Sequence, residues 1–166
     1  MKKNDGIWKI TTMLVIAGLL AMISPGILAS QLATVEKVTC KEVTFPDSNL
    51  EAAIRGVIEK PEGPIFAREL KELINLDASY RGIADLTGIE YCTNLIELNL
   101  EYNEISDVSP VSSLINLEKL NLGGNRISDV SPVSSLINLE KLNLGGNRIS
   151  DVSPVSSLIN LEKLNL

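Results

Sequence analysis

A 22-residue unit repeats along the second half of this 166-residue chain. Residues 117–138 recur without change as residues 139–160, and residues 95–116 match them at 17 of 22 positions. Residues 73–94 share only seven identities with residues 95–116, but their apolar positions coincide. A partial fifth copy, 161–166, follows these four. A period of this length is typical of a solenoid, in which each copy forms one coil and buries its apolar face against its neighbours.

The first half of each copy has the period of a β-strand. The later copies contain L-x-x-L-x-L-x-x-N-x-I, and in the third copy Leu120 and Leu122 alternate with Lys119, Asn121 and Gly123. Such alternation points two leucines inward and three residues outward. We therefore expect an α/β repeat fold: a right-handed leucine-rich repeat solenoid with a parallel sheet on its concave side.

The second half of each copy has apolar residues at every third position, as in Ile127, Val130, Val133 and Leu136. That spacing predicts 3₁₀ or short helical turns on the convex side. Ser131 before Pro132 predicts an N-cap followed by proline at the first helical position. The asparagine after each strand is expected to bond backbone groups at the turn; these are Asn103, Asn125 and Asn147.

Residues 44–72 break the period and predict an amino-terminal cap of two short helices. Leu50, Ile54 and Ile58 form one apolar face at helical spacing, and Ser48 with Glu51 forms a capping-box pattern. A second short helical segment leads from residue 67 into the first copy. The cap is expected to cover leucines that would otherwise face water.

The first 30 residues have the pattern of a secretory signal peptide, and residues 31–43 are expected to form a linker. Three lysines precede an uncharged run over residues 13–23, which is followed by Ser-Pro-Gly and small residues. The run is too short for a regular membrane span. Cleavage after Ala29 or Ser30 is the favoured reading. The alternative is that the segment stays as a membrane anchor, which would be the only membrane contact.

The composition disfavours most kinds of enzyme. The chain has no histidine, two cysteines, six aromatic residues and a net charge of −6. The absence of histidine removes His-based acid–base catalysis, His-containing triads and His metal clusters. An acidic surface also repels phosphate backbones. We therefore expect no catalysis, no cofactor, no metal and no nucleic acid partner.

The outward-facing positions of the strands form the predicted protein-binding face. The candidate contact residues are Glu97, Asn99, Glu101, Tyr102, Lys119, Asn121, Arg126, Lys141, Asn143 and Arg148. The row changes from acidic in the early copies to basic in the later ones, and such a charge gradient can steer a partner. The alternative is that these charges are ordinary solvated residues duplicated with the repeat.

Three further sets of residues have competing interpretations. Tyr80 and Tyr102 are either anchors for a partner or a cover for the cap. The aspartates at 85, 107, 129 and 151 are predicted to cap turns, with a shared cation as the weaker alternative. Cys92 occupies a leucine position and is predicted to be a small buried hydrophobe, whereas a bridge to Cys40 is the alternative.

The sequence over residues 44–166 resembles the internalin-like bacterial leucine-rich repeat proteins. The resemblance rests on FPD at 45–47, NLEAAIR at 49–55, DLTGIEY at 85–91 and the recurring N-x-I-S-D-x-S-P. It implies a secreted or cell-surface protein that binds other proteins through its concave sheet. The sequence ends within a strand pattern at Leu166, so we expect an amino-terminal fragment of a longer protein. The alternatives are a targeting module of a larger exported enzyme and an architectural spacer without a ligand.

Overall fold

The computed structural model describes residues 41–166. The predicted signal peptide, residues 31–40 of the predicted linker, and Cys40 lie outside this range. In the part of the chain that the structure describes, no helix has the length and apolar character needed to cross a membrane.

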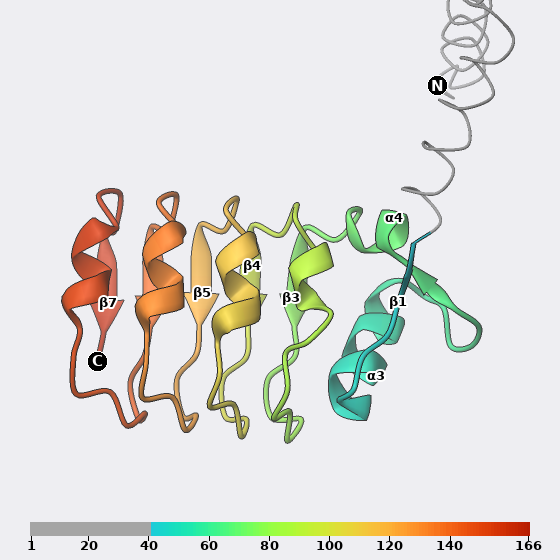
Figure 1. Ribbon diagram of the computed structural model, residues 1–166, viewed down its shortest axis with the longest axis horizontal. Helices are drawn as coiled ribbons and strands as arrows, with labels where there is room; N and C mark the ends of the chain where they lie inside the picture. The colour runs from blue at the N-terminus through green and yellow to red at the C-terminus, as the bar shows by residue number, and fades with distance from the viewer. Residues whose placement is uncertain (1–40) are drawn as a thin grey trace, which may run out of the picture. The chain divides into compact units, whose positions relative to one another are not determined.

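The repeats form a five-stranded parallel sheet in chain order (Figure 1). Neighbouring strands pair in a register shifted by one repeat, so that Leu98 lies opposite Leu120 and Leu120 opposite Leu142. This register places equivalent residues of successive copies in rows across the sheet, as the sequence predicted. The strands are β3 (Asn75–Asp77), β4 (Glu97–Asn99), β5 (Lys119–Asn121), β6 (Lys141–Asn143) and β7 (Lys163–Asn165).

Short 3₁₀ helices return the chain on the other side of each coil, and Figure 1 shows them stacked in front of the strands. They are η2 (Ile89–Tyr91), η3 (Ser109–Ser113), η4 (Ser131–Ser135) and η5 (Ser153–Ser157). Ser131 is the first residue of its helix and not the N-cap. Its N–H donates to the Asp129 carboxylate at 2.8 Å, so the aspartate satisfies the first free donor of the turn.

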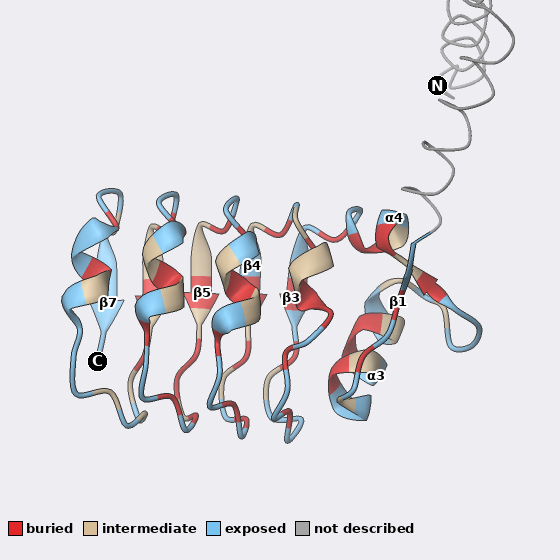
Figure 2. Cartoon of the chain, in the orientation of Figure 1, coloured by how far each residue is buried: buried red, intermediate tan, exposed pale blue. Residues whose placement is uncertain are grey.

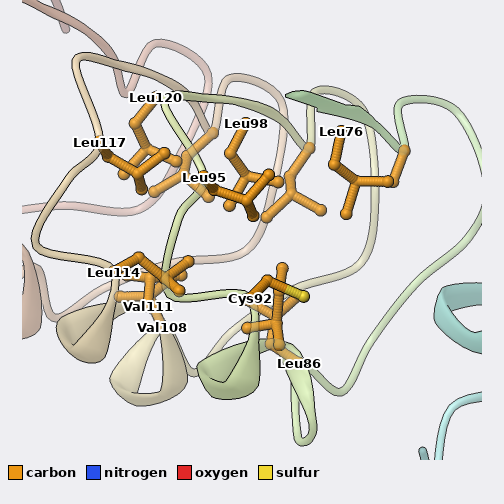
Figure 3. Close-up of a cluster of buried hydrophobic side chains, with 14 of the residues drawn as sticks. Leu76, Leu86, Cys92, Leu95, Leu98, Val108, Val111, Leu114, Leu117 and Leu120 are labelled. Carbon is orange, nitrogen blue, oxygen red and sulfur yellow. The ribbon is translucent and has the colours of Figure 1, made fainter. Parts of the chain in front are cut away.

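The core lies between the sheet and the 3₁₀ helices (Figure 2). Figure 3 shows leucines from the strand side facing valines and leucines from the helix side, among them Leu98, Leu120 and Val111. Because each coil contributes only a thin layer of apolar side chains, the core is continuous from copy to copy. Cys92 is fully buried within it, at a position where the next copy has Leu114.

Buried asparagines hold the turns that follow the strands. The Asn125 side-chain amide donates to the carbonyls of Leu100 and Leu122 at 2.9 and 3.0 Å. Its oxygen accepts from the N–H of Ile105 at 3.1 Å. One side chain therefore joins two coils and satisfies backbone groups that would be costly to leave unpaired. Asn103 and Asn147 make equivalent contacts.

The amino-terminal cap contains a strand pair as well as two helices. Its helices are α3 (Ser48–Val57) and α4 (Ala67–Leu70), and its strands are β1 (Glu42–Val43) and β2 (Ile65–Phe66). The two strands pair antiparallel. The cap therefore begins at least two residues earlier than the sequence predicted, because Glu42 and Val43 belong to this sheet and not to a linker.

Asp47 fastens the cap to the first coil. It is the N-cap of α3, since one carboxylate oxygen accepts from the N–H groups of Asn49 and Leu50. The other oxygen accepts from Ala84 and Asp85 in the first repeat, at 2.7 and 3.2 Å. The predicted capping box of Ser48 and Glu51 is therefore wrong: Ser48 is already the first helical residue, and its neighbour satisfies the free donors.

Candidate functional site

The outer face of the parallel sheet forms a groove of about 600 Å³. It is lined by residues of all five strands, β3 to β7: those at the outward positions and the leucine between them. The groove brings together six of the predicted contact residues: Glu97, Asn99, Lys119, Asn121, Lys141 and Asn143. Lys163 and Asn165 extend the same rows into the last strand.

The charges in this groove are distributed unevenly. Lys119 forms an ion pair with Glu97 on the neighbouring strand, and the hydrogen bond and charge of Glu97 raise the pKa of Lys119. Lys141 and Lys163 take part in no ion pair within residues 41–166. The charges of Glu97 and Lys119 in β4 and β5 thus neutralise each other, whereas β6 and β7 carry two lysines available to another molecule.

The asparagine row at the end of the strands is partly used within the protein. Asn121 accepts from the N–H of Gly123 at 3.1 Å and from the Asn143 side-chain amide at 2.8 Å. Asn165 donates to Asn143 in the same way. A Cβ on Gly123 would lie 2.7 Å from the Asn143 amide nitrogen, so the glycine leaves room for this side chain, whereas the second copy has Glu101 at the same position. The asparagines therefore form a hydrogen-bonded floor to the groove.

The remaining predicted residues lie beyond the carboxyl ends of the strands and do not line the groove. Arg126 pairs with Glu104 at 3.1 Å, whereas Arg148 makes no ion pair among the described residues. Glu101 and Tyr102 stand at the rim that follows β4. The predicted contact residues therefore fall into two groups, one that lines the groove and one at a separate rim.

Two tyrosines stack at that rim. The ring centroids of Tyr80 and Tyr102 are 4.7 Å apart and the ring planes meet at 23°. Tyr80 is 70% exposed and Tyr102 is 54% exposed. The rings therefore form an exposed aromatic pair, and neither is buried beneath the cap.

The aspartate ladder acts as a set of turn caps. Asp107, Asp129 and Asp151 each accept from the N–H of the serine two residues later, at 2.8 Å. Hydrogen bonds from the serine hydroxyl and the serine N–H lower the pKa of each carboxyl. Residues 41–166 contain no group of three acidic, histidine or cysteine side chains arranged to hold a metal.

Among residues 41–166, Cys92 is a free thiol. Its burial, followed by the charge of Glu90, raises its pKa to about 12. A thiol is nucleophilic only as the thiolate, so this side chain is inert near neutral pH and acts in packing.

A family model for leucine-rich repeats in two copies matches residues 93–135, 115–155 and 137–166. Together with the parallel sheet and the 3₁₀ returns, these matches define the molecule as a leucine-rich repeat protein. Repeat proteins of this kind typically present an extended binding surface and no catalytic site. A comparison with curated protein sequences gave no match.

Solved structures give a narrower relationship. An internalin, InlF, from Listeria monocytogenes has 37% identity and a TM-score of 0.72, over 80% of this chain and 38% of that chain. Internalin C2 from the same organism has 29% identity and a TM-score of 0.59, over 76% and 69% of the two chains. The functional domain of InlJ, also from Listeria monocytogenes, has 26% identity and a TM-score of 0.57, over 76% and 33%. This chain is similar to the internalins, and it spans 38% of the length of InlF.

The sequence predicted which residues face outward from the strands, but it did not predict which of their charges form ion pairs. The pairing of Lys119 with Glu97 follows from their direct register across β4 and β5, which the 22-residue offset already implied. Asp47 was missed as a junction residue because its partners, Ala84 and Asp85, are backbone groups and carry no sequence signal.

Proposed function

We infer that this protein binds another protein through the groove on its parallel sheet, without catalysing a reaction. The observation that carries this proposal is the presence of Lys141 and Lys163 in a groove of about 600 Å³, with no ion pair among the described residues. Lysines held one strand spacing apart attract an acidic surface and set its orientation. The proposed contact residues are the six predicted residues that line the groove, Lys163, and the four predicted residues at the rim.

The groove lacks features that chemistry on a small substrate would need. Its lining consists of asparagine, lysine, acidic and leucine residues from short strands, and the leucines of β3 to β6 are 2% exposed. The Asn121 and Asn143 oxygens already accept hydrogen bonds within the protein. A broad, shallow, periodic surface suits contact with a second macromolecule better than enclosure of a small ligand.

Export to the cell surface or the medium is the second part of the proposal. It is supported by the amino-terminal pattern of lysines, an uncharged run and small residues over 1–30. Expression in a secreting bacterium, followed by mass spectrometry of the released protein, tests it. Export with a new amino terminus at residue 30 or 31 is expected. Retention of the full chain in the cytoplasm would contradict it.

Charge reversal in the groove tests the binding proposal. A partner captured by the full chain is titrated against the double variant Lys141→Glu and Lys163→Glu, with Lys71→Glu as an exposed control outside the groove. The groove variant is expected to weaken binding at least tenfold and to reduce its dependence on salt, while the control changes neither. An unchanged affinity in the groove variant would refute the proposed site and leave an architectural role for the repeats.

A further inference from the structure

The stacked tyrosines occupy a position that the later copies give to glycine. Tyr80, Tyr102, Gly124 and Gly146 are each separated by one repeat of 22 residues. The backbone N–H of Tyr80 donates to Glu101 in the next coil at 2.9 Å, and that of Tyr102 donates to Gly123. All four positions therefore share one backbone turn, and only the first two coils carry a side chain on it.

The turn at this position is unfavourable for a tyrosine. Tyr80 and Tyr102 have φ values of +56° and +52°, and the glycines have +67° and +71°. Residues with a Cβ are rare in this left-handed region because of steric crowding, whereas glycine enters it freely. Core burial does not compensate for the cost, since Tyr80 and Tyr102 are both more than half exposed. The Tyr102 ring lies between the Tyr80 ring and the Gly124 turn, which leaves the outer face of Tyr80 open at the surface.

The surroundings of the rings are suited to positive charge. Glu101 is the residue just before Tyr102, and its backbone carbonyl accepts from the Tyr80 N–H. Its carboxylate belongs to no ion pair among residues 41–166, and its charge, after burial, acts to raise the pKa of Tyr80. Within the same residues, the cations that lie over aromatic rings face Tyr91 and Phe66. Arg81, next to Tyr80 in sequence, is over neither ring of the pair. Aromatic faces carry partial negative charge, and a neighbouring carboxylate increases their attraction for a cation.

We propose that Tyr80, Tyr102 and Glu101 form a subsite for a cationic side chain, arginine or lysine, presented by the protein partner. The proposal rests on the proposed function and adds the direction in which the partner lies along the solenoid. A basic segment of the partner contacts the rim of the first two coils, and an acidic segment faces Lys141 and Lys163 in the later coils. The partner is thereby held in one direction along the solenoid.

The subsite is tested with a small probe, so that no partner is needed. The full chain is labelled with ¹³C-tyrosine and titrated with N-acetyl-arginine-N-methylamide, while the neutral citrulline analogue serves as the matched control. The chain has three tyrosines, and Tyr91, whose ring already faces Lys41, is the internal reference. The Tyr80 and Tyr102 ring signals are expected to shift with arginine more than with citrulline, and Tyr91 is expected to stay in place.

Variants separate a binding role from a structural one. Tyr80→Gly and Tyr102→Gly install the residue of the later copies and relieve the left-handed strain, so the thermal midpoint is expected to hold or rise. Each is expected to weaken arginine binding by about two- to fivefold, as for an exposed cation–π contact. Glu101→Gln is expected to reduce the difference between arginine and citrulline.

Equal shifts with arginine and citrulline, or equal shifts at Tyr91, would overturn the subsite. So would a fall in the thermal midpoint of both glycine variants without any loss of probe binding. These outcomes leave the groove proposal standing, because that proposal is tested by reversal of Lys141 and Lys163. Conversely, if reversal of the lysines refutes the groove proposal, the arginine titration still tests the subsite, because it needs no protein partner.

Discussion

The first and last coils of the solenoid have leucines at equivalent strand positions but differ in how well these are covered. Leu76 in β3 is 2% exposed, whereas Leu164 in β7 is 42% exposed. The cap packs α3 against β3 on one side, and the next coil packs against it on the other. Within residues 41–166, β7 has a neighbouring strand on one side, β6. A leucine in this fold is thus buried by neighbouring coils more than by its own.

The same difference extends to polar groups. Asn103 and Asn125 are buried at 7% and 6% exposure, while Asn147, one coil from the end of the sheet, is only partly buried. Copies three and four have identical sequences, so this difference cannot come from composition. Stability in a solenoid is set by the interfaces between repeats, and identical repeats acquire different stabilities from their positions.

The largest effect should come from removing a strand leucine between two coils. Leu98→Ala deletes a side chain that is 2% exposed, and we expect it to lower the free energy of unfolding by about 2–5 kcal/mol. Leu164→Ala, at the equivalent position in β7, should cost less than about 1 kcal/mol because Leu164 is already 42% exposed. Urea denaturation followed by circular dichroism measures both. Equal costs would break the comparison between inner and terminal coils.

Loss of a turn asparagine should have the next largest effect. Asn125→Ala leaves the carbonyls of Leu100 and Leu122 and the N–H of Ile105 without this partner. We expect a loss of about 1–3 kcal/mol, the cost of unpaired buried polar groups. Asn147→Ala is the matched control, in which water can reach the freed groups more easily. The interpretation fails if the two variants are equally stable.

The junction between the cap and the first coil should depend on pH. Burial acts to raise the pKa of Asp47, but four backbone N–H donors outweigh it, and the pKa is lowered from its usual value of 3.8. The carboxylate therefore contributes stability above about pH 4, and this contribution is lost as the pH falls through the lower pKa of the folded state.

Asp47→Asn should flatten this part of the acid-unfolding curve and lower stability near pH 7. Glu62→Gln, an exposed change in the cap, should leave the curve unaltered. Thermal melts between pH 2 and pH 7 measure both variants. An unchanged pH profile for Asp47→Asn would show that this junction does not couple the cap to the repeats.

The smallest effect should come from the ion pair in the groove. Lys119 and Glu97 are 41% and 48% exposed, so their coupling should be below about 1 kcal/mol. A double-mutant cycle of Lys119→Met and Glu97→Gln measures it, and the coupling should fall further in 1 M salt. A larger coupling that persists in salt would indicate that the early strands are organised by charge as well as by leucine packing.

The repeat fold could be predicted from the sequence because the determining features are local and periodic. Every leucine of the L-x-x-L-x-L frame in the second copy, such as Leu98 and Leu100, is buried as expected. The aspartate before each Val-Ser-Pro caps its turn, also as expected. A 22-residue period fixes the register between strands, and the register fixes which side chains share a row.

The cap and the rim were harder to predict because their contacts join residues far apart in sequence. The β1–β2 pair consists of two residues a side, which is too short for alternation to be visible. Asp47 contacts backbone groups 37 and 38 residues away. The stacking of Tyr80 on Tyr102 depends on a left-handed backbone turn that the sequence indicates only through the glycines of later copies.

Amide hydrogen exchange resolved by residue tests most directly the claim that each coil is stabilised by its neighbours. The N–H groups of Leu100, Leu122 and Leu144 make equivalent bonds of 2.8 Å to the following strand. If neighbouring coils provide the stability, protection should be high at Leu100 and Leu122 and clearly lower at Leu144, whose partner strand is β7. Equal protection at all three, or greater protection at Leu144, would contradict the account.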